Sequence, residues 1–167
     1  VSGIDNAEGT LFRNTHFIIT PGPRATAEHL GLLRRMAGYC RFGDVIETTP
    51  ERHDEMIAYT SQLMHVIAVS VCDNDELFSC KGFEGGSFRD CTRVAALDAA
   101  MWTQLFTFNA PALAKVVGTL ENRMRQYREA IEAGDQDALR AMLAQASDRK
   151  KQINLERARG DDVRPGF

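Results

Sequence analysis

The sequence predicts a mainly α-helical chain that is preceded by a short strand–helix–strand unit. Two apolar, β-branched runs, 16–20 and 45–49, each end at a proline and have the length of buried strands. Farther along, no glycine occurs between Gly43 and Gly82, which favours long helices in that stretch.

Composition and charge limit the classes of function. The chain has 167 residues, of which 44% are hydrophobic and 26% charged, a mixture typical of soluble globular proteins with one or two domains. A net charge of −3 argues against a broad nucleic-acid surface. No apolar run approaches the ~20 residues that cross a bilayer, and no secretory leader begins the chain. We therefore expect neither a nucleic-acid partner nor a membrane partner.

The first 50 residues are predicted to form a βαβ unit with parallel strands. Thr26 is a suitable N-cap, Leu30 and Leu33 share one face of the following helix, and Gly38 marks its end. Strand, helix and strand with short links imply parallel pairing. Because one such unit cannot complete a sheet, residues 1–50 are interpreted as the last part of an α/β domain whose beginning is missing. The lack of an initiator methionine agrees with this interpretation.

Residues 51–167 are predicted to form a helical domain. Its first helix begins at Thr49 or Pro50 and continues through about Val71, with apolar residues along one stripe. The remaining helices follow from a cap signal near residue 109 and a break near residue 134.

A heptad-like seam is the most regular pattern in the sequence. After Asn109 and Pro111, a suitable cap and first-turn pair, apolar residues step alternately by four and three. They are Leu113, Val117, Leu120, Met124, Tyr127 and Ile131. The seam ends at Gly134, and a last helix is expected from Asp135 to near Arg159, with a frayed end at 160–167. Because such a seam requires a partner helix, we expect a homodimer.

The four cysteines argue against a metal site. Cys40, Cys72, Cys80 and Cys91 form no CxxC pair and have no zinc-ligand spacing. A chain of this size does not need disulfides for stability. We interpret them as buried, reduced thiols in a cytoplasmic protein and predict no metal.

Asp54, Ser61 and His65 are the first candidate group for chemistry. On an uninterrupted helix, at about 100° per residue, they fall within about 40° of one another. Asp54 and His65 are three turns apart, on the order of 16 Å, so they cannot share a proton but can line one wall of a cleft. The alternative is a first-turn acid stabilised by the helix dipole and a satisfied, partly buried histidine. Spacing alone favours this alternative.

A glycine-rich approach to a helix at 82–93 is the second candidate. Three glycines within five residues precede Arg89 and Arg93. Free backbone N–H groups and two guanidinium groups at a helix start suit an anionic small molecule. Asp90 can pair with Arg93 along the helix. The alternative is an ordinary loop, a cap from Ser87 and a surface ion pair.

Trp102 is the third candidate. It follows Arg93 by nine residues, about half a turn out of phase on one straight helix. Composition favours a core position for this tryptophan. The alternative is a helix whose two sides serve different neighbours.

Read in order, these residues resemble the prephenate/arogenate dehydrogenase family of tyrosine biosynthesis. The most specific motif is the string from Gly85 to Ala95, which reads GGSFRDCTRVA. Weaker matches cover nearly the whole chain in the same order. They are Ser2-Gly3, Leu11-Phe12, Ile18-Ile19-Thr20-Pro21, His53-Asp54 with Ala58, Ser61-Gln62-Leu63-Met64-His65 and Met101-Trp102.

The resemblance implies an N-terminal Rossmann domain and a C-terminal helical dimerisation domain like that of 6-phosphogluconate dehydrogenase. Residues 1–50 would end the first, and 51–167 would form the second. The family's reaction is the NAD(P)-dependent oxidative decarboxylation of prephenate to 4-hydroxyphenylpyruvate. The family's catalytic histidine and glycine fingerprint would lie upstream of this chain. By itself, the chain is therefore expected to bind no NAD or NADP and to turn over no prephenate.

The resemblance also implies roles for residues of this chain. Arg93 would bind a substrate carboxylate, a task that suits its planar, permanently charged fork, and Asp90 would orient it by an ion pair. The other residues implied to contact the substrate are His65, Gly85, Gly86 and Trp102. Trp102 would reach the partner subunit's site or the dimer core. The implied supporting residues are Asp54, Arg89 and Ser61.

The sequence departs from the family pattern at Gln62. The family often reads Ser-His-Leu-Pro-His where this chain has residues 61–65. Glutamine at this position argues against a titrating role, and the missing proline predicts a more regular helix.

Three other interpretations compete with prephenate oxidation. The first is an arogenate dehydrogenase, and the second is a helical dimerisation module without catalysis. The third is an HD-type metal phosphohydrolase, which His53-Asp54 suggests. Adjacent residues point about 100° apart on a helix, and His16 and His29 are poorly placed as further ligands, which argues against the third.

Overall fold

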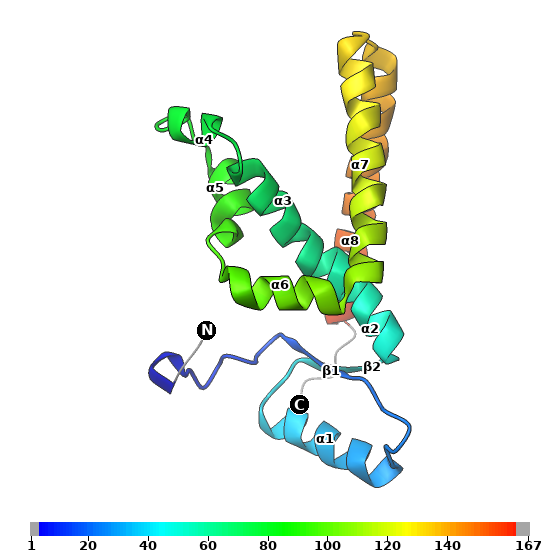
Figure 1. The fold of residues 1–167 in the computed structure, drawn as a ribbon. Helices are drawn as coiled ribbons and strands as arrows, with labels where there is room; N and C mark the ends of the chain where they lie inside the picture. The colour runs from blue at the N-terminus through cyan, green and yellow to red at the C-terminus, as the bar shows by residue number, and fades with distance from the viewer. Residues whose placement is uncertain (1–3, 163–167) are drawn as a thin grey trace. The chain divides into compact units, whose positions relative to one another are not determined.

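The computed structural model describes residues 4–162, which are mainly helical (Figure 1). Its contacts divide the chain into two units, residues 1–116 and 117–167. The first unit contains a βαβ segment and a set of shorter helices, and the second is a helical hairpin. The boundary at residues 50 and 51 that the sequence suggests stays a prediction.

Residues 16–47 form the predicted βαβ unit. Strand β1 (His16–Ile19) pairs in parallel with β2 (Asp44–Glu47), and helix α1 (Ala27–Tyr39) connects them. The Thr26 hydroxyl accepts a hydrogen bond from the His29 backbone N–H and caps α1, as predicted. The helix ends one residue past Gly38.

The helix that begins at Pro50 is interrupted by a π turn. Helix α2 (Pro50–Ile57), capped by Thr49, leads into a π turn at Ala58–Gln62, and α3 (Leu63–Cys72) follows. The prediction of a regular helix through this region was wrong. A π turn holds an extra residue and often occurs at functional sites. The turn includes Gln62, whose buried side chain bonds to residues far along the chain.

Short helices connect α3 to the second unit. They are α4 (Glu76–Ser79), α5 (Gly86–Thr92) and α6 (Ala99–Phe108), with a 3₁₀ turn at Arg93–Ala95 after α5. The Asp98 carboxylate accepts a hydrogen bond from the Met101 N–H and caps α6. In Figure 1, α3, α5 and α6 outline a triangle within the first unit.

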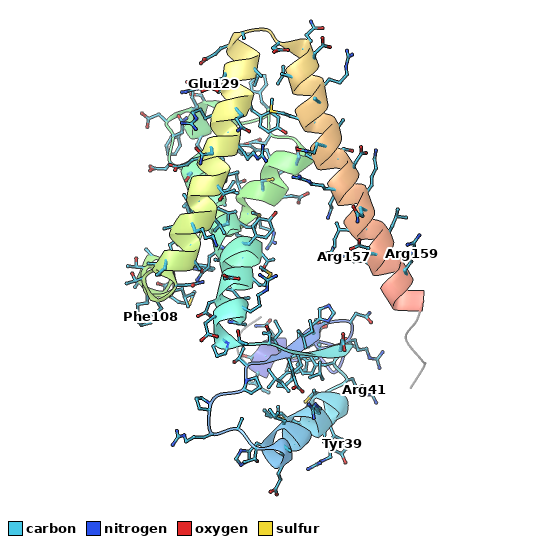
Figure 2. All side chains as sticks on the ribbon, turned by 90° about the vertical axis from the view of Figure 1, so that its right-hand side faces the viewer. Tyr39, Arg41, Phe108, Glu129, Arg157 and Arg159 are labelled. Atoms are coloured by element: carbon cyan, nitrogen blue, oxygen red, sulfur yellow. The ribbon has the colours of Figure 1, made fainter. Side chains whose placement is uncertain are left out.

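The second unit is a hairpin whose turn follows the predicted signals. Helix α7 (Ala110–Glu132) ends before Gly134, which has φ +63°, and the Asp135 N–H donates to the Ala130 carbonyl in a left-handed cap. The Asp135 carboxylate then caps α8 (Gln136–Asp162). In Figure 2, Glu129 lies near this turn, and Arg157 and Arg159 lie near the far end of α8. The predicted frayed end was wrong up to residue 162, and residues 163–167 lie outside the described residues.

The apolar seam of α7 is only partly covered in this chain. Leu113 is buried, but Met124 and Ile131 are each 63% exposed. The described core consists largely of small side chains, among them Ala58 at 0% exposure, and large ones such as Phe108 remain open to solvent (Figure 2). A considerable apolar surface is therefore left without a partner among residues 4–162.

The cysteine prediction holds in part. All four cysteines are free, as expected, but Cys40 and Cys91 are exposed. Their predicted burial was wrong because Cys40 follows the end of α1 and Cys91 lies on the short helix α5, none of whose residues is buried. Between residues 4 and 162, no helix combines the length and the apolar character needed to cross a membrane.

Candidate substrate site

The most specific sequence motif packs against the helix that carries His65. Helix α5 and the following 3₁₀ turn, which together hold Gly86 to Ala95, both contact α3. The structure therefore brings together two of the candidate groups, although 20 residues or more separate them in the sequence.

His65 is half-buried and its orientation is defined by two contacts. Its Nδ1 lies 3.0 Å from the carbonyl oxygen of Ser61. Because a carbonyl only accepts hydrogen bonds, Nδ1 carries the proton in the neutral ring, and Nε2 is then an acceptor. The ring also stacks on Trp102 of α6, with centroids 3.7 Å apart and planes inclined by 27°. A ligand hydroxyl that reached Nε2 would meet a hydrogen-bond acceptor held in place.

Trp102 lies between His65 and Phe106. It is half-buried, and its ring meets Phe106 edge to face at 5.4 Å between centroids. The premise of one straight helix from Arg93 to Trp102 was wrong, because the chain leaves helical geometry after Ala95 and α6 begins anew at Ala99. The half-turn displacement predicted between these two residues therefore does not apply.

The glycine-rich segment at residues 82–86, which leads into α5, has open space beside its backbone. Gly85 occupies the N-cap position of α5 and no side chain caps this helix, so the predicted cap from Ser87 was wrong. Apart from its chain neighbours and its own helix backbone, a Cβ atom added at Gly85 or Gly86 would meet no atom of the described residues within 4 Å. The glycine that needs its conformational freedom is Gly82, with φ +91°.

The charged residues of the motif are exposed. Arg89, Asp90 and Arg93 are all open to solvent, and within residues 4–162 no ion pair joins Asp90 to Arg93. The predicted pair was wrong for this chain because α5 ends at Thr92 and Arg93 begins a 3₁₀ turn, which changes the spacing of the two side chains. Arg93 is thus a permanent cation without an internal partner among the described residues.

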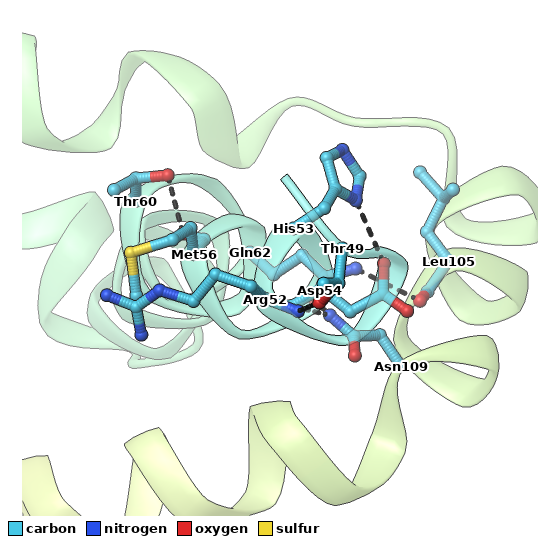
Figure 3. Close-up of polar contacts among 9 residues, drawn as sticks. All are labelled: Thr49, Arg52, His53, Asp54, Met56, Thr60, Gln62, Leu105 and Asn109. Carbon is cyan, nitrogen blue, oxygen red and sulfur yellow. Dashed lines mark hydrogen bonds and ion pairs between the residues drawn. The ribbon is translucent and has the colours of Figure 1, made fainter. Parts of the chain in front are cut away.

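A polar cluster that the sequence did not reveal ties α2 and the π turn to the junction of α6 and α7 (Figure 3). The Asn109 side-chain nitrogen donates to the Asp54 carbonyl at 2.9 Å and to the Gln62 Oε1 at 2.8 Å. The Gln62 Nε2 donates to the Leu105 carbonyl at 3.1 Å. Sequence reasoning expected Asn109 only as a helix cap, and no local signal marks a contact across 47 residues.

The predicted alignment of Asp54, Ser61 and His65 loses its basis at the π turn. It was calculated for an uninterrupted α-helix, and the turn at 58–62 lies between the first residue and the third. The Asp54 carboxylate instead lies 2.9 Å from Nδ1 of the neighbouring His53. Within the described part of the chain, no three His, Cys, Asp or Glu side chains are placed to hold a metal ion.

Comparisons with known proteins show which family the chain resembles. Residues 49–145 match the family described as "Prephenate dehydrogenase, dimerization domain". The cyclohexadienyl dehydrogenase of Zymomonas mobilis is 32% identical over 146 residues, which are 83% of this chain and 49% of the relative. The prephenate dehydrogenase of Bacillus subtilis is 26% identical over 159 residues, 92% of this chain and 43% of the relative.

Two solved structures are also similar. The prephenate dehydrogenase of A. aeolicus, in complex with hydroxyphenyl propionate and NAD+, superposes with a TM-score of 0.77 at 26% identity, over 90% of this chain and 54% of that one. The Synechocystis arogenate dehydrogenase has a TM-score of 0.75 at 25% identity, over 90% of this chain and 56% of that one.

These similarities establish the class of the chain and its family. Its fold, a helical domain that follows a βαβ unit, is that of the dimerisation part of an oxidoreductase. The chain belongs to the prephenate dehydrogenase family. It spans about half the length of the curated relatives that it matches.

Proposed function

We propose that the protein containing this chain is a prephenate or arogenate dehydrogenase, and that this chain supplies part of its substrate site. One observation carries the proposal: the string from Gly85 to Arg93 packs on α3, whose His65 presents an acceptor nitrogen. NAD or NADP would accept the hydride from the ring carbinol carbon, while the ring carboxylate leaves as carbon dioxide.

The residues of this chain would bind and orient the substrate. The Arg93 guanidinium would bind a carboxylate, for which its planar fork is suited. His65 Nε2 would accept a hydrogen bond from the substrate. The open space beside Gly85 and Gly86 would allow the substrate to approach the backbone closely. Trp102 would offer an aromatic surface. The supporting residues would be Asp54, Arg89 and Ser61.

The described residues fit only one edge of a cofactor site. The loops after β1 and β2 line a cavity of about 600 Å³, at the carboxyl edge where parallel sheets bind ligands. However, the Thr49 hydroxyl already caps α2, and no glycine fingerprint for a pyrophosphate is present. These residues do not by themselves form a dinucleotide site, and we assign them no step that involves the cofactor.

We also propose that the protein is a cytoplasmic homodimer. The exposed seam residues Met124 and Ile131 and the family's description as a dimerization domain support the dimer. The free cysteines support a reducing compartment. Sedimentation at micromolar concentration should show a dimer, and a monomer would contradict this part of the proposal.

Substitution of Arg93 tests the proposed activity. In the full-length protein, NAD(P)-dependent dehydrogenation of prephenate and of arogenate is measured for the wild type and for Arg93→Ala. When the substrate carboxylate loses its partner, the free energy of binding should weaken by roughly 2–5 kcal/mol. KM should therefore increase by a factor of between about 30 and several thousand. Arg35→Ala is the matched control, because Arg35 is also exposed but lies on α1. Equal KM values for the two variants would refute the role of Arg93, and a wild type inactive on both compounds would refute the activity.

A further inference from the structure

Gln62 joins two helices one turn away from the His65–Trp102 stack. Its Nε2 bonds to the carbonyl of Leu105 in α6, and His65 of α3 stacks on Trp102 of α6. Residue 65 follows 62 by three positions, and residue 102 precedes 105 by three. The two contacts are therefore about one helical turn apart on each segment, and they follow one another in opposite directions along the chain.

The chemistry of the partners fixes the direction of each hydrogen bond. The carbonyls of Leu105 and Asp54 can only accept, so the atoms that face them are the amide nitrogens of Gln62 and Asn109. The remaining contact then runs from the Asn109 nitrogen to the Gln62 oxygen. Gln62 thus uses one donor and one acceptor, and both hydrogens of the Asn109 amide are engaged.

The Gln62 side chain bonds to a carbonyl of α6 that has no partner within the helix. The last four carbonyls of an α-helix lack helical partners, and that of Leu105 is one of them. The Asn109 N–H, which would reach it in a continuing helix, bonds to the Thr107 carbonyl instead. Because Gln62 is only 5% exposed, water has little access to replace its side chain in this contact.

We propose that Gln62, held by Asn109, is a positioning residue that fixes α6 against α3 and so holds Trp102 on His65. The consequence for substrate binding rests on the proposed function, whereas the consequence for the ring stack does not. Gln62 itself acts through the other side chains and is not assigned a contact with substrate.

The fluorescence of Trp102 tests the effect on the stack, because it is the only tryptophan of the chain. The emission of an indole depends on the groups in contact with its ring, so loosening the stack on His65 should change the intensity. Gln62→Met keeps the length of the side chain but removes both hydrogen bonds, and we expect an emission intensity different from that of the wild type. The matched control is Gln104→Met, because Gln104 is an exposed glutamine on α6, the helix that carries Trp102. This substitution should leave the emission unchanged.

Two further variants separate positioning from general loosening. In a His65→Ala background, Gln62→Met should no longer change the emission, because the ring that stacks on Trp102 is absent. Gln62→His, measured at pH 8 where its ring is neutral, again offers one donor and one acceptor and should restore the wild-type intensity. Circular dichroism confirms that each variant is folded. The proposal is overturned if a folded Gln62→Met variant has the emission of the wild type. It is also overturned if Gln62→Met changes the emission equally in the presence and in the absence of His65.

Kinetics of the full-length enzyme test the consequence for substrate. Gln62→Met should raise KM for the accepted substrate about tenfold, the equivalent of one lost hydrogen bond, with a smaller change in kcat and none in KM for the cofactor. An unchanged substrate KM beside altered emission refutes the link to binding. If the wild type oxidises neither prephenate nor arogenate, the proposed function fails, while the emission data still decide the structural role.

Discussion

Replacing Asn109 with alanine should destabilise the first unit by about 1–3 kcal/mol. The change removes two hydrogen bonds, one to the Asp54 carbonyl and one to the Gln62 oxygen. Asp54 is exposed, so water can replace the first bond at little cost. Gln62 is 5% exposed, and an unsatisfied polar atom at such a position costs about 1–3 kcal/mol. For a chain of this length, Tm should fall by roughly 2–12 °C.

Thermal and urea unfolding, followed by circular dichroism, measure this loss. Asn122→Ala is the matched control, because Asn122 also lies on α7 but bonds to the exposed Arg125, and it should change stability by less than about 0.5 kcal/mol. In a Gln62→Met background the oxygen that Asn109 satisfies is absent, so Asn109→Ala should cost distinctly less. Equal costs in the two backgrounds, or a loss no larger than that of Asn122→Ala, would show that the two amides do not act together.

Two further predictions concern the packing of the first unit. Ala58 is fully buried where the π turn begins, so Ala58→Leu should overpack this site and lower the free energy of unfolding by about 1–3 kcal/mol, as measured with urea. The control is Tyr59→Leu at the neighbouring residue, whose side chain is 60% exposed. It should change the free energy of unfolding by less than about 0.5 kcal/mol. Arg34 of α1 pairs with Glu47 of β2, and their side chains are 52% and 33% exposed. Arg34→Gln should therefore lower the free energy of unfolding by no more than about 1 kcal/mol at low salt, and by nothing measurable in 1 M salt. An equal loss at both salt concentrations would contradict a screened surface pair.

Local chemistry explains why many elements were predictable from the sequence. Thr26 and Thr49 cap helices through backbone groups three residues away, and Gly134 and Asp135 end one helix and begin the next within a single turn. The two short β-branched runs, each of which ends at a proline, pair in parallel because the links allow no other simple arrangement. The family resemblance rested on the same kind of local information, a contiguous string of residues.

The site was less predictable, because its geometry depends on partners distant in sequence. The family resemblance implies roles for Arg93 and His65, but the change from α to 3₁₀ geometry after Thr92 is not visible in the sequence. Because of this change, the predicted Asp90–Arg93 pair does not form. The burial of Cys91 was likewise judged from residue type, which carries no information about the side of a helix that faces outward.

The sequence by itself determined the βαβ unit, the helix ends at the capping residues, the hairpin turn at Gly134 and the family. Only the tertiary structure decided the π turn, the stack of His65 on Trp102 and the amide cluster of Gln62 and Asn109. Caps and turns are satisfied by backbone groups within a few residues, so the local sequence suffices to specify them. A buried amide is satisfied wherever the fold supplies a partner, and here that partner lies 47 residues away.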